Sequence, residues 1–384
     1  MQFALSEELA LTRSAIREFA ENEIGAGAAD RDASERFDRP LFQKMAELGL
    51  TGIPIGERYG GAGGNWLAYS IVLEEIARVC ASTAAALHAH TVFAAWPLYA
   101  YGSESTKRLI LPRLASGSCL GGSALPDVNI GKAKQMRKLS VHTSETQWQL
   151  NGRHPYVLHG GNADWYVIYA RAGKQDKGDR EHSSGTGAFL MEGSSRGLQF
   201  GKKFRTLGLR SLMITSASFK QCSIPENHKI GSNVQSKEIH SSLTNLGYLG
   251  AAAQSVGVAQ GALEAAATYA KTRKQFGTSI SKQQGISFKI ADMSASLDAA
   301  RLLVYQAAWR KDQGLHYGRA AAIARKYAAD MAVFATKEAV QIFGGNGYMQ
   351  EYRMERLMRD AKCIQTEMGT GGMSTNCSLA ILSD

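Results

Sequence analysis

The residues best suited to chemistry gather in one C-terminal run, QIFGGNGYMQEYRMERLMRDAKCIQTEMGT, from Gln341 to Thr370. Gly344 and Gly345 follow an apolar helical pattern, and glycine permits a positive φ and a close approach of ligand to backbone. The same glycines also fit a simple helix C-cap. Near the end of the run stands one carboxylate, Glu367, followed by Met368. A carboxylate can act as a general base, whereas the thioether of Met368 cannot.

A second chemical signal is the segment RKQFGTSISKQQ, which carries Arg273, Phe276 and Gln284 at a turn between two helical patterns. An arginine offers a fixed positive charge and two parallel hydrogen bonds to a phosphate. For Arg273 taken alone, the alternative is an ordinary surface charge. His88 and His90 lie in the apolar stretch TAAALHAHTVF, and we interpret them as core residues rather than ligands.

Length and composition describe an ordinary globular protein. The 384 residues suit two or three domains, and 44% of them are hydrophobic and 20% charged. No apolar run reaches the roughly 20 residues of a membrane span, and the N-terminus fits neither a signal nor a transit peptide. The cysteines are scattered without metal-ligand spacing, which predicts reduced thiols, a cytoplasmic location and no metal site: Cys80, Cys119, Cys222, Cys363 and Cys377.

The hydrophobic pattern divides the chain into three domains. Residues 1–120 follow a helical period, residues 121–236 consist of short β-branched and aromatic runs separated by turns, and residues 237–384 return to long helices. In the last segment, the short turns FGTSIS and QGLHYG predict an antiparallel four-helix bundle completed by the C-terminal segment. The fold class is therefore α+β and mostly α.

Two motifs, RKQFGTSISKQQGISFKIADM and the run from Gln341 to Lys362, closely resemble the acyl-CoA dehydrogenase family, in particular its short-chain or butyryl-type members. The resemblance extends along the chain through GIPIGERYGGAGG, YGSESTKRLILPRLASG and LGLRSLMITSASFKQCSIPENHKIG. It implies that family's fold, with an N-terminal helical domain, a middle β domain and a C-terminal four-helix bundle. It also implies an FAD cofactor and an acyl thioester substrate.

By this resemblance, one group of residues contacts the adenine and pyrophosphate of an FAD, commonly one bound mainly by a neighbouring subunit. The group comprises Arg273, Phe276, Gln284, Gln341, Gly344 and Gly345, with Thr370 and Gly372 as the next expected contacts.

The chain departs from the family pattern beside the flavin ring. The family's Thr-Glu-Pro begins with Ala124 here, a nearby serine falls on Ile130, and its Trp-Ile-Thr reads Tyr156, Val157 and Leu158. Tyr156 can still stack on a flavin, but Leu158 offers no hydrogen bond to the flavin N5. A buried nitrogen left unpaired costs about 1–3 kcal/mol.

The substrate side departs as well. The family's catalytic glutamate precedes Gly-Thr, where this chain has Met368, and the helix to which some members move that glutamate has Gly247 in its place. Loss of a positioned base costs about 10²–10⁴ in rate. Glu367, one position early, is then the candidate base, and a backbone N–H near Met368 is expected to polarise the thioester carbonyl. The expected substrate contacts are Asn245, Tyr248 and Gly369.

These residues are compatible with three functions. The first, which we favour, is an FAD-dependent oxidoreductase acting on an acyl thioester of CoA or of an acyl carrier protein, with Glu367 or no side chain as base. The second is an altered reaction on the same scaffold, an isomerase or a monooxygenase of secondary metabolism. The third is a non-catalytic subunit, with weak or lost FAD binding, that pairs with an active homologue.

The net charge of +10 and pI of about 9.3 favour an anionic partner such as the CoA phosphates or an acidic carrier protein, although a solvated basic face is the alternative. No nucleic-acid motif accompanies the charge, and we expect neither nucleic acid nor a membrane as partner. By resemblance, a homotetramer is the default assembly, with a dimer or a mixed oligomer as alternatives. The basic clusters are Lys132, Lys134, Arg137, Lys138, Lys202, Lys203 and Arg205.

Overall fold

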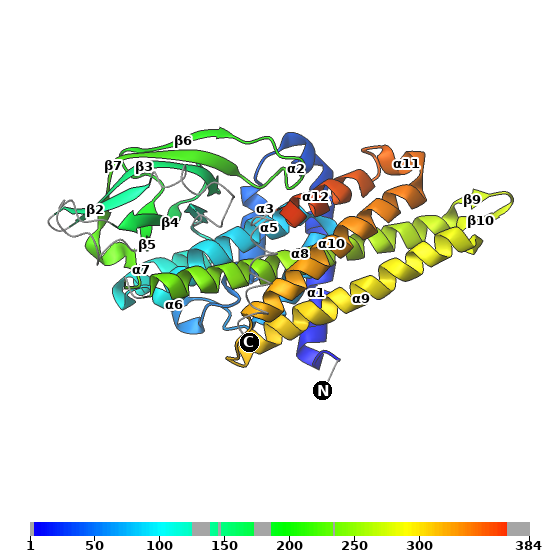
Figure 1. Ribbon diagram of the computed structural model, residues 1–384, viewed down its shortest axis with the longest axis horizontal. Coiled ribbons are helices and arrows are strands. Elements are labelled where there is room, and N and C mark those ends of the chain that lie inside the picture. The colour runs from blue at the N-terminus through cyan, green and yellow to red at the C-terminus, as the bar shows by residue number, and fades with distance from the viewer. Residues whose placement is uncertain (1–3, 125–138, 145–146, 173–185, 233–234, 367–384) are drawn as a thin grey trace.

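Helices, a β-sheet and a second set of helices follow one another along the chain, as the computed structural model shows (Figure 1). The structure describes residues 4–124, 139–144, 147–172, 186–232 and 235–366. The predicted fold class is confirmed. None of the helices in these ranges has the length and apolar character needed to span a bilayer.

Side-chain caps start several of the N-terminal helices. Ser6, Asp38, Asn65 and Ser103 each accept a hydrogen bond from a backbone N–H in the first turn, which satisfies an otherwise unpaired donor. The helices and helical turns are α1 (Glu7–Phe19), η1 (Ala20–Gly25), α2 (Ala28–Ser34), α3 (Arg39–Glu47), η2 (Leu50–Gly52), η3 (Glu57–Tyr59), α4 (Trp66–Val79), α5 (Ala81–His90), η4 (Thr91–Ala95), α6 (Trp96–Tyr101) and α7 (Glu104–Ala115).

Helix α5 is buried on all sides. Every residue from Ala81 to Ala95 is buried, as the nearly polar-free sequence predicts. The small alanines of this stretch let the sheet approach one face of α5 and the long helix α8 (Ser236–Thr272) another.

The middle of the chain forms one sheet in the order β6-β7-β3-β1-β4-β5-β8, with β2 pairing both β3 and β4. Strand β1 runs parallel to β4 and antiparallel to β3, so that Ala124 faces Val157 and Ser123 faces Leu158 in register. The strands are β1 (Gly121–Ala124), β2 (Ser140–Ser144), β3 (Gln147–Leu158), β4 (Trp165–Ala172), β5 (Thr186–Glu192), β6 (Leu198–Lys203), β7 (Ile214–Pro225) and β8 (Lys229–Ile230), with η5 (Glu226–His228) between the last two.

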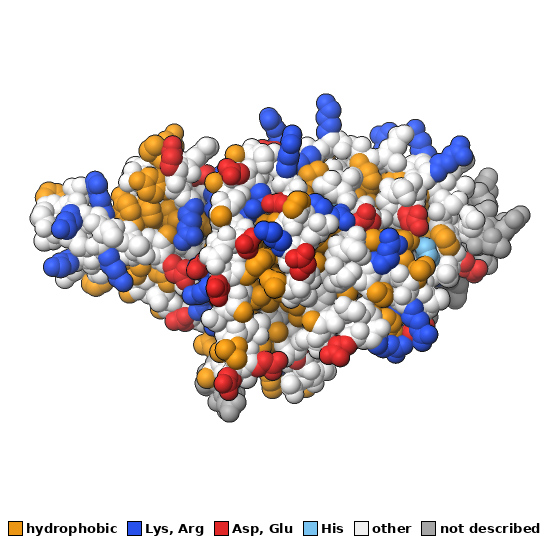
Figure 2. Space-filling view, turned by 180° about the vertical axis from the view of Figure 1, so that it is seen from behind, with side chains coloured by type: hydrophobic (Ala, Val, Ile, Leu, Met, Phe, Trp, Pro, Cys, Tyr) orange, Lys and Arg blue, Asp and Glu red, His pale blue; other side chains and the backbone are white. Residues whose placement is uncertain are grey.

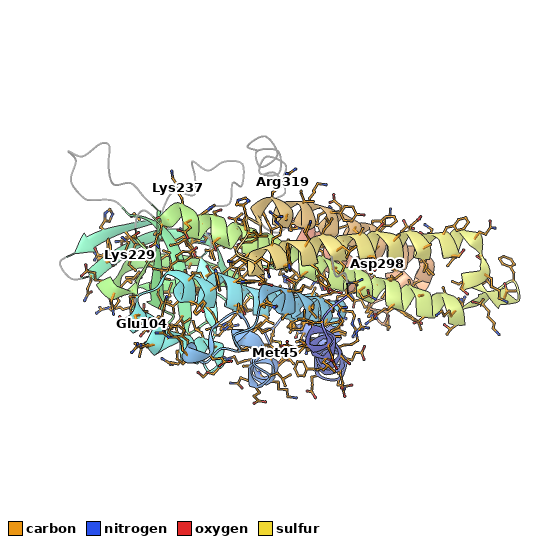
Figure 3. The ribbon with its side chains drawn as sticks, turned by 90° about the horizontal axis from the view of Figure 1, so that it is seen from below. Met45, Glu104, Lys229, Lys237, Asp298 and Arg319 are labelled. Atoms are coloured by element: carbon orange, nitrogen blue, oxygen red, sulfur yellow. The ribbon has the colours of Figure 1, made fainter. Side chains whose placement is uncertain are left out.

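The C-terminal helices pack side by side as the predicted bundle (Figure 3). Helix α8 lies at its centre and contacts α9, α10 and α12 as well as α4 of the N-terminal domain. The elements are β9 (Lys274–Gln275), β10 (Thr278–Ser279), η6 (Ile280–Lys282), α9 (Gln284–Asp312), α10 (Gly318–Phe343), α11 (Gly345–Tyr348) and α12 (Met354–Thr366).

Two glycines of α8 allow close contact with the backbone of α4. A Cβ on Gly257 would lie 2.1 Å from the carbonyl oxygen of Glu74, and one on Gly261 would lie 2.2 Å from that of Arg78. No side chain fits at either distance. The sequence of α8 therefore sets the separation of the two domains at this point.

A buried ion-pair network surrounds the same contact. Glu74 and Glu75 are 2% and 1% exposed, and Arg78 is 4% exposed. The Arg301 Nε of α9 donates to Glu74 at 2.9 Å, and Arg17 of α1 donates to Glu75 at 2.9 Å. Because each buried charge has an opposite partner, the network holds α1, α4 and α9 in one arrangement.

We predict that Gly257→Ala destabilises the protein by at least about 1–3 kcal/mol, because the new methyl group meets backbone that cannot move without separating α4 from α8. Gly285→Ala is the matched control, since a Cβ there meets nothing within 4 Å and alanine favours the helix by up to about 1 kcal/mol. Urea unfolding measures both. Equal midpoints for the two variants would contradict the close contact.

Candidate functional site

The hairpin between α8 and α9 carries one part of the predicted cofactor site. Arg273 follows the last residue of α8, and Phe276 sits at the hairpin tip with φ of 53° and 95% of its surface exposed. Gln284 is exposed at the first position of α9. An aromatic ring held in a left-handed backbone and left in solvent is costly, so Phe276 marks a contact surface.

The end of α10 carries a second part. Gln341 is exposed, and the main chain turns at Gly344 with φ of 58°. The Gly344 N–H donates to the Gln341 carbonyl at 3.1 Å, so this glycine does cap the helix. A Cβ on Gly344 or Gly345 would meet nothing within 4 Å, whereas one on Gly347 would lie 2.4 Å from the Val340 carbonyl oxygen. Gly344 and Gly345 thus leave their backbone open to a ligand.

Aromatic contacts hold these two parts together. Tyr269 of α8 stacks on Phe343 of α10 with ring centroids 4.1 Å apart, and Asn346 Nδ2 donates to the Tyr269 hydroxyl at 3.0 Å. The structure therefore brings Arg273, Phe276, Gln284, Gln341, Gly344 and Gly345 to one end of the bundle, which we call the bundle-end half-site.

The predicted flavin-ring residues lie on adjacent strands of the sheet. Ala124 is fully buried, Leu158 is 6% exposed and Tyr156 is 49% exposed. The Tyr156 ring lies 5.7 Å from that of Phe204, which is itself 39% exposed. Ala124, Tyr156 and Leu158 form the sheet half-site, whose only side-chain polar group is the tyrosine hydroxyl.

The two half-sites of one chain lie apart. The sheet stands at one end of the long axis of the molecule and the β9–β10 hairpin at the other (Figure 1). A single chain therefore does not bring the predicted adenine contacts and the predicted flavin-ring contacts together.

Buried histidines tie α5 to the strands of the sheet half-site. His90 Nδ1 accepts from the Gly121 N–H at 2.9 Å, and its Nε2 lies 3.1 Å from the Leu114 carbonyl oxygen. His159, directly after Leu158, places its Nε2 3.0 Å from the Ala86 carbonyl oxygen. These contacts confirm His90 as a core residue and show how β1 and β3 are positioned.

Two of the predicted substrate residues, Asn245 and Tyr248, lie on α8. Tyr248 is 2% exposed, and Asn245 is half-buried beside Gly318 at the start of α10. The His88 ring packs over Gly250, where a Cβ would lie 2.0 Å from its Cε1, and its Nδ1 lies 3.2 Å from the Tyr69 hydroxyl. This packing was not predicted from the sequence. The spacing of Gly247 and Gly250 is the sequence feature that could have indicated it.

Another unpredicted group anchors α12, the helix that ends directly before Glu367. Asp360 is 2% exposed and accepts from the Leu209 N–H at 2.7 Å, and the Gly208 N–H lies 2.9 Å from Cys363 Sγ. Burial raises the pKa of Asp360 to about 6. Arg359 NH2 pairs with Asp32 at 2.6 Å. The predicted residues Glu367, Met368, Gly369, Thr370, Gly372 and Ile130 lie outside the described residues.

In the basic cluster of Lys202, Lys203 and Arg205, one side chain is engaged in contacts within the protein. Lys203 donates its Nζ to the carbonyl oxygens of Glu35 and Arg210, while Lys202 and Arg205 are exposed. The other predicted cluster, residues 132–138, lies outside the described residues. Within the described ranges, no group of histidine, cysteine and carboxylate side chains is arranged to hold a metal ion.

Comparison with known proteins identifies the class. The N-terminal domain of acyl-CoA dehydrogenases matches residues 6–118, and their C-terminal domain matches residues 239–380. The chain belongs to the acyl-CoA dehydrogenase family, whose members are FAD-dependent oxidoreductases acting on CH–CH bonds.

Among individual relatives, the short-chain-specific acyl-CoA dehydrogenase of Clostridium acetobutylicum is 38% identical over 370 residues, which covers 96% of each chain. The solved butyryl-CoA dehydrogenase of Megasphaera elsdenii is 34% identical, with a TM-score of 0.93 over 100% of both chains. PigA, solved with FAD and proline, is 25% identical, with a TM-score of 0.91 over 99% of both chains.

The buried histidines predict an acid-sensitive fold. Burial lowers the pKa of His88 and of His90 to about 3 and that of His159 to about 4, below the ~6.5 of an unfolded histidine. At a pH between the folded and the unfolded pKa values, the unfolded chain binds more protons than the folded chain. The contribution of these histidines to the free energy of unfolding therefore has its full value above pH ~6.5 and falls as the pH drops. Each histidine contributes at most about 1.4 kcal/mol per pH unit, against an opposite contribution from the raised pKa of Asp360.

We expect the urea midpoint to fall steadily from pH 7.5 to pH 5, and His90→Gln to reduce that slope relative to the wild-type protein. His316→Gln, which changes an exposed histidine, is the control and is expected to keep the wild-type slope. A midpoint that does not change across this range would refute the neutral, buried state of these rings.

Proposed function

We propose that the protein is an FAD-dependent dehydrogenase of acyl thioesters, acyl-CoA foremost, whose FAD is held between two copies of the chain. The observation that carries the proposal is the separation of the two half-sites in one chain, with Phe276 exposed in one of them and Tyr156 in the other. A second copy supplies the bundle-end half-site to the flavin carried by the sheet of the first.

The bundle-end half-site fits the adenosine and pyrophosphate end of FAD. Arg273 offers a fixed charge for the phosphates, Gly344 and Gly345 leave room for a ligand against the backbone, and Phe276 presents an exposed ring for stacking. When bound, FAD would accept the hydride from the β-carbon of the acyl chain.

The sheet half-site fits the flavin ring less well. Tyr156 exposes an aromatic face suited to stacking, but Leu158 has no donor for the ring nitrogen N5. One unsatisfied nitrogen costs about 1–3 kcal/mol, which corresponds to an FAD affinity about 5–150 times weaker than with a threonine at this position. This departure supports the alternative of a non-catalytic or chemically altered subunit.

An apolar stripe on the outside of the bundle supports a homo-oligomer. Phe288, Leu302 and Trp309 are 62%, 49% and 49% exposed, and their spacing of fourteen and seven residues places them on one side of α9. Tyr327 on α10 is also 41% exposed. Figure 2 shows hydrophobic side chains at the surface toward the hairpin end of the bundle. We infer a homotetramer, in which two chains share each FAD.

The reaction also requires a catalytic base, and the family position for it is occupied by Met368 in this chain. The reaction removes an α-proton together with the hydride, and a carboxylate must lie within hydrogen-bond reach of that proton. We propose Glu367 for this role, because Met368 cannot accept a proton. A cytoplasmic location and the choice between CoA and an acyl carrier protein as thioester carrier stay predictions.

The shared cofactor predicts that Arg273→Gln weakens FAD binding at least about tenfold, since a charged phosphate contact is lost on the subunit that does not carry the flavin ring. FAD content after gel filtration and an equilibrium titration measure the effect. Arg196→Gln, an exposed arginine near the sheet, is the matched control. If mixing Arg273→Gln with a Tyr156→Ala variant restores no FAD binding, the site is not shared between chains.

Replacing the presumed base distinguishes the candidate functions. With butyryl-CoA under anaerobic conditions, Glu367→Gln should slow flavin bleaching by about 10²–10⁴, and Met368→Glu should accelerate it relative to the wild-type protein. Met358→Glu adds a carboxylate at a partly exposed position of α12 and is the control. If neither the FAD-loaded wild-type protein nor FAD-loaded Met368→Glu bleaches, dehydrogenation is excluded and the altered reaction is favoured.

A further inference from the structure

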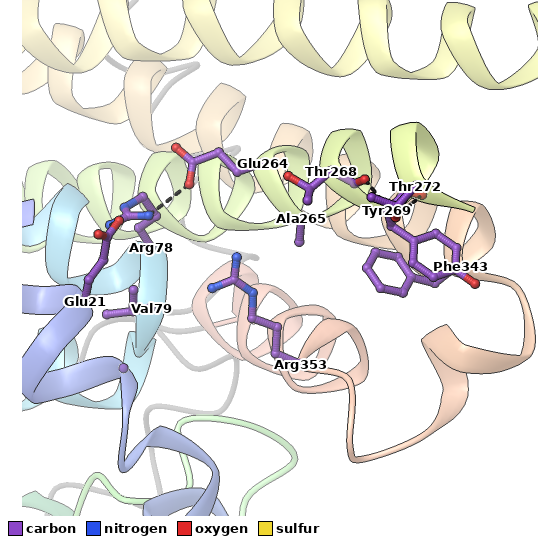
Figure 4. A pocket seen from close by; sticks show the side chains of 11 residues that line it. Glu21, Arg78, Val79, Glu264, Ala265, Thr268, Tyr269, Thr272, Phe343 and Arg353 are labelled. Carbon is purple, nitrogen blue, oxygen red and sulfur yellow. Dashed lines mark hydrogen bonds and ion pairs between the residues drawn. The ribbon is translucent and has the colours of Figure 1, made fainter. Parts of the chain in front are cut away.

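A cleft of about 690 Å³ lies between η1, α4, α8 and the segment that leads into α12, and one end of it adjoins the bundle-end half-site through the Tyr269–Phe343 pair (Figure 4). Its wall comes from the N-terminal domain on one side and from the bundle on the other. Its size falls in the range of small-molecule sites. None of the predicted cofactor or substrate residues lines it.

The cleft contains one cation without a carboxylate partner. Arg353, directly before α12, extends into the cleft and donates NH2 to the Gly261 carbonyl oxygen at 3.2 Å (Figure 4). Within the described part of the chain, no carboxylate lies within ion-pair distance of its guanidinium. Burial and the charge of Arg78 lower the pKa of Arg353, while the charges of Glu264 and Glu21 act in the opposite direction.

The acidic residues of the cleft are committed to another arginine. Glu21 pairs with Arg78 at 2.6 Å and Glu264 pairs with Arg78 at 2.9 Å. Arg17 lies 3.6 Å from Glu264 as well. Both carboxylates already form ion pairs with Arg78. The guanidinium N–H groups of Arg353 are therefore available to a ligand of opposite charge.

The other end of the cleft is aromatic. The stacked rings of Tyr269 and Phe343 line it, beside the hydroxyl-bearing residues Thr268 and Thr272. An aromatic wall next to a guanidinium is suited to a planar ring that carries an acidic group.

We propose that this cleft, the Arg353 cleft, binds a small organic anion, with a carboxylate or phosphate on Arg353 and a planar ring against the Tyr269–Phe343 pair. The proposal is independent of the thioester chemistry. The site adjoins the α4–α8 contact, so that a bound anion links the N-terminal domain to the bundle.

The test uses full-length protein saturated with FAD, titrated calorimetrically with adenosine 5′-monophosphate, 4-hydroxybenzoate and inorganic phosphate. At least one of the two ring-bearing anions should bind more tightly than phosphate, and Arg353→Gln should weaken that binding about tenfold or more. Arg196→Gln, the same change at an exposed arginine near the sheet, is the matched control and should leave the affinity unaltered.

Thermal unfolding separates a ligand site from a structural arginine. Without ligand, Arg353→Gln should unfold at the wild-type temperature or above, because it removes a charge with no carboxylate partner. With the anion, the wild-type temperature should rise and that of the variant should not. In the titration, the proposal is overturned if none of the probes binds, if Arg353→Gln binds as tightly as wild type, or if Arg196→Gln alone abolishes binding. In the unfolding experiment, it is overturned if Arg353→Gln lowers the ligand-free melting temperature or changes the oligomeric mass.

Discussion

The contact between α4 and α8 is the constraint on which the rest of the structure depends. Gly257 and Gly261 bring α8 against the α4 backbone, and the buried charges of Glu74, Glu75 and Arg78 surround that contact. Because α8 is also the centre of the bundle, its position fixes the hairpin after Thr272 and the end of α10 stacked on Tyr269. The bundle-end half-site and the Arg353 cleft are both consequences of this one packing.

The sheet half-site is positioned through a second route. Helix α5 lies between β1 and α8, and neutral histidines hydrogen-bonded to main-chain groups hold the strands to it. His90 can serve in this way because burial keeps its ring uncharged, so that Nδ1 accepts from the Gly121 N–H and Nε2 donates to the Leu114 carbonyl oxygen. The cost is sensitivity to acid, since each ring must be protonated as the chain unfolds below neutral pH.

We propose that the departures from the family pattern lie beside the flavin and the substrate, while the fold around them is that of the family. Leu158 and Ala124 are buried apolar residues on adjacent strands, so the sheet packs without a polar side chain at either position. On this proposal the bundle end keeps the residues that resemble the family's cofactor motifs, Arg273 and the glycines, while the sheet has no hydrogen-bond donor at Leu158.

The sequence by itself determined the order of helices, sheet and bundle, because hydrophobic periodicity and cap residues act over short distances along the chain. It also predicted Arg273, Phe276, Gln341 and the glycines as cofactor contacts, because these motifs are local. Only the tertiary structure decided that these residues meet at one end of the bundle, far from Tyr156 and Leu158, and that Arg353 lies in a cleft without a carboxylate partner. Such relations depend on packing between helices hundreds of residues apart, where a missing Cβ or an ion pair sets the distance, and no pattern along the chain records them.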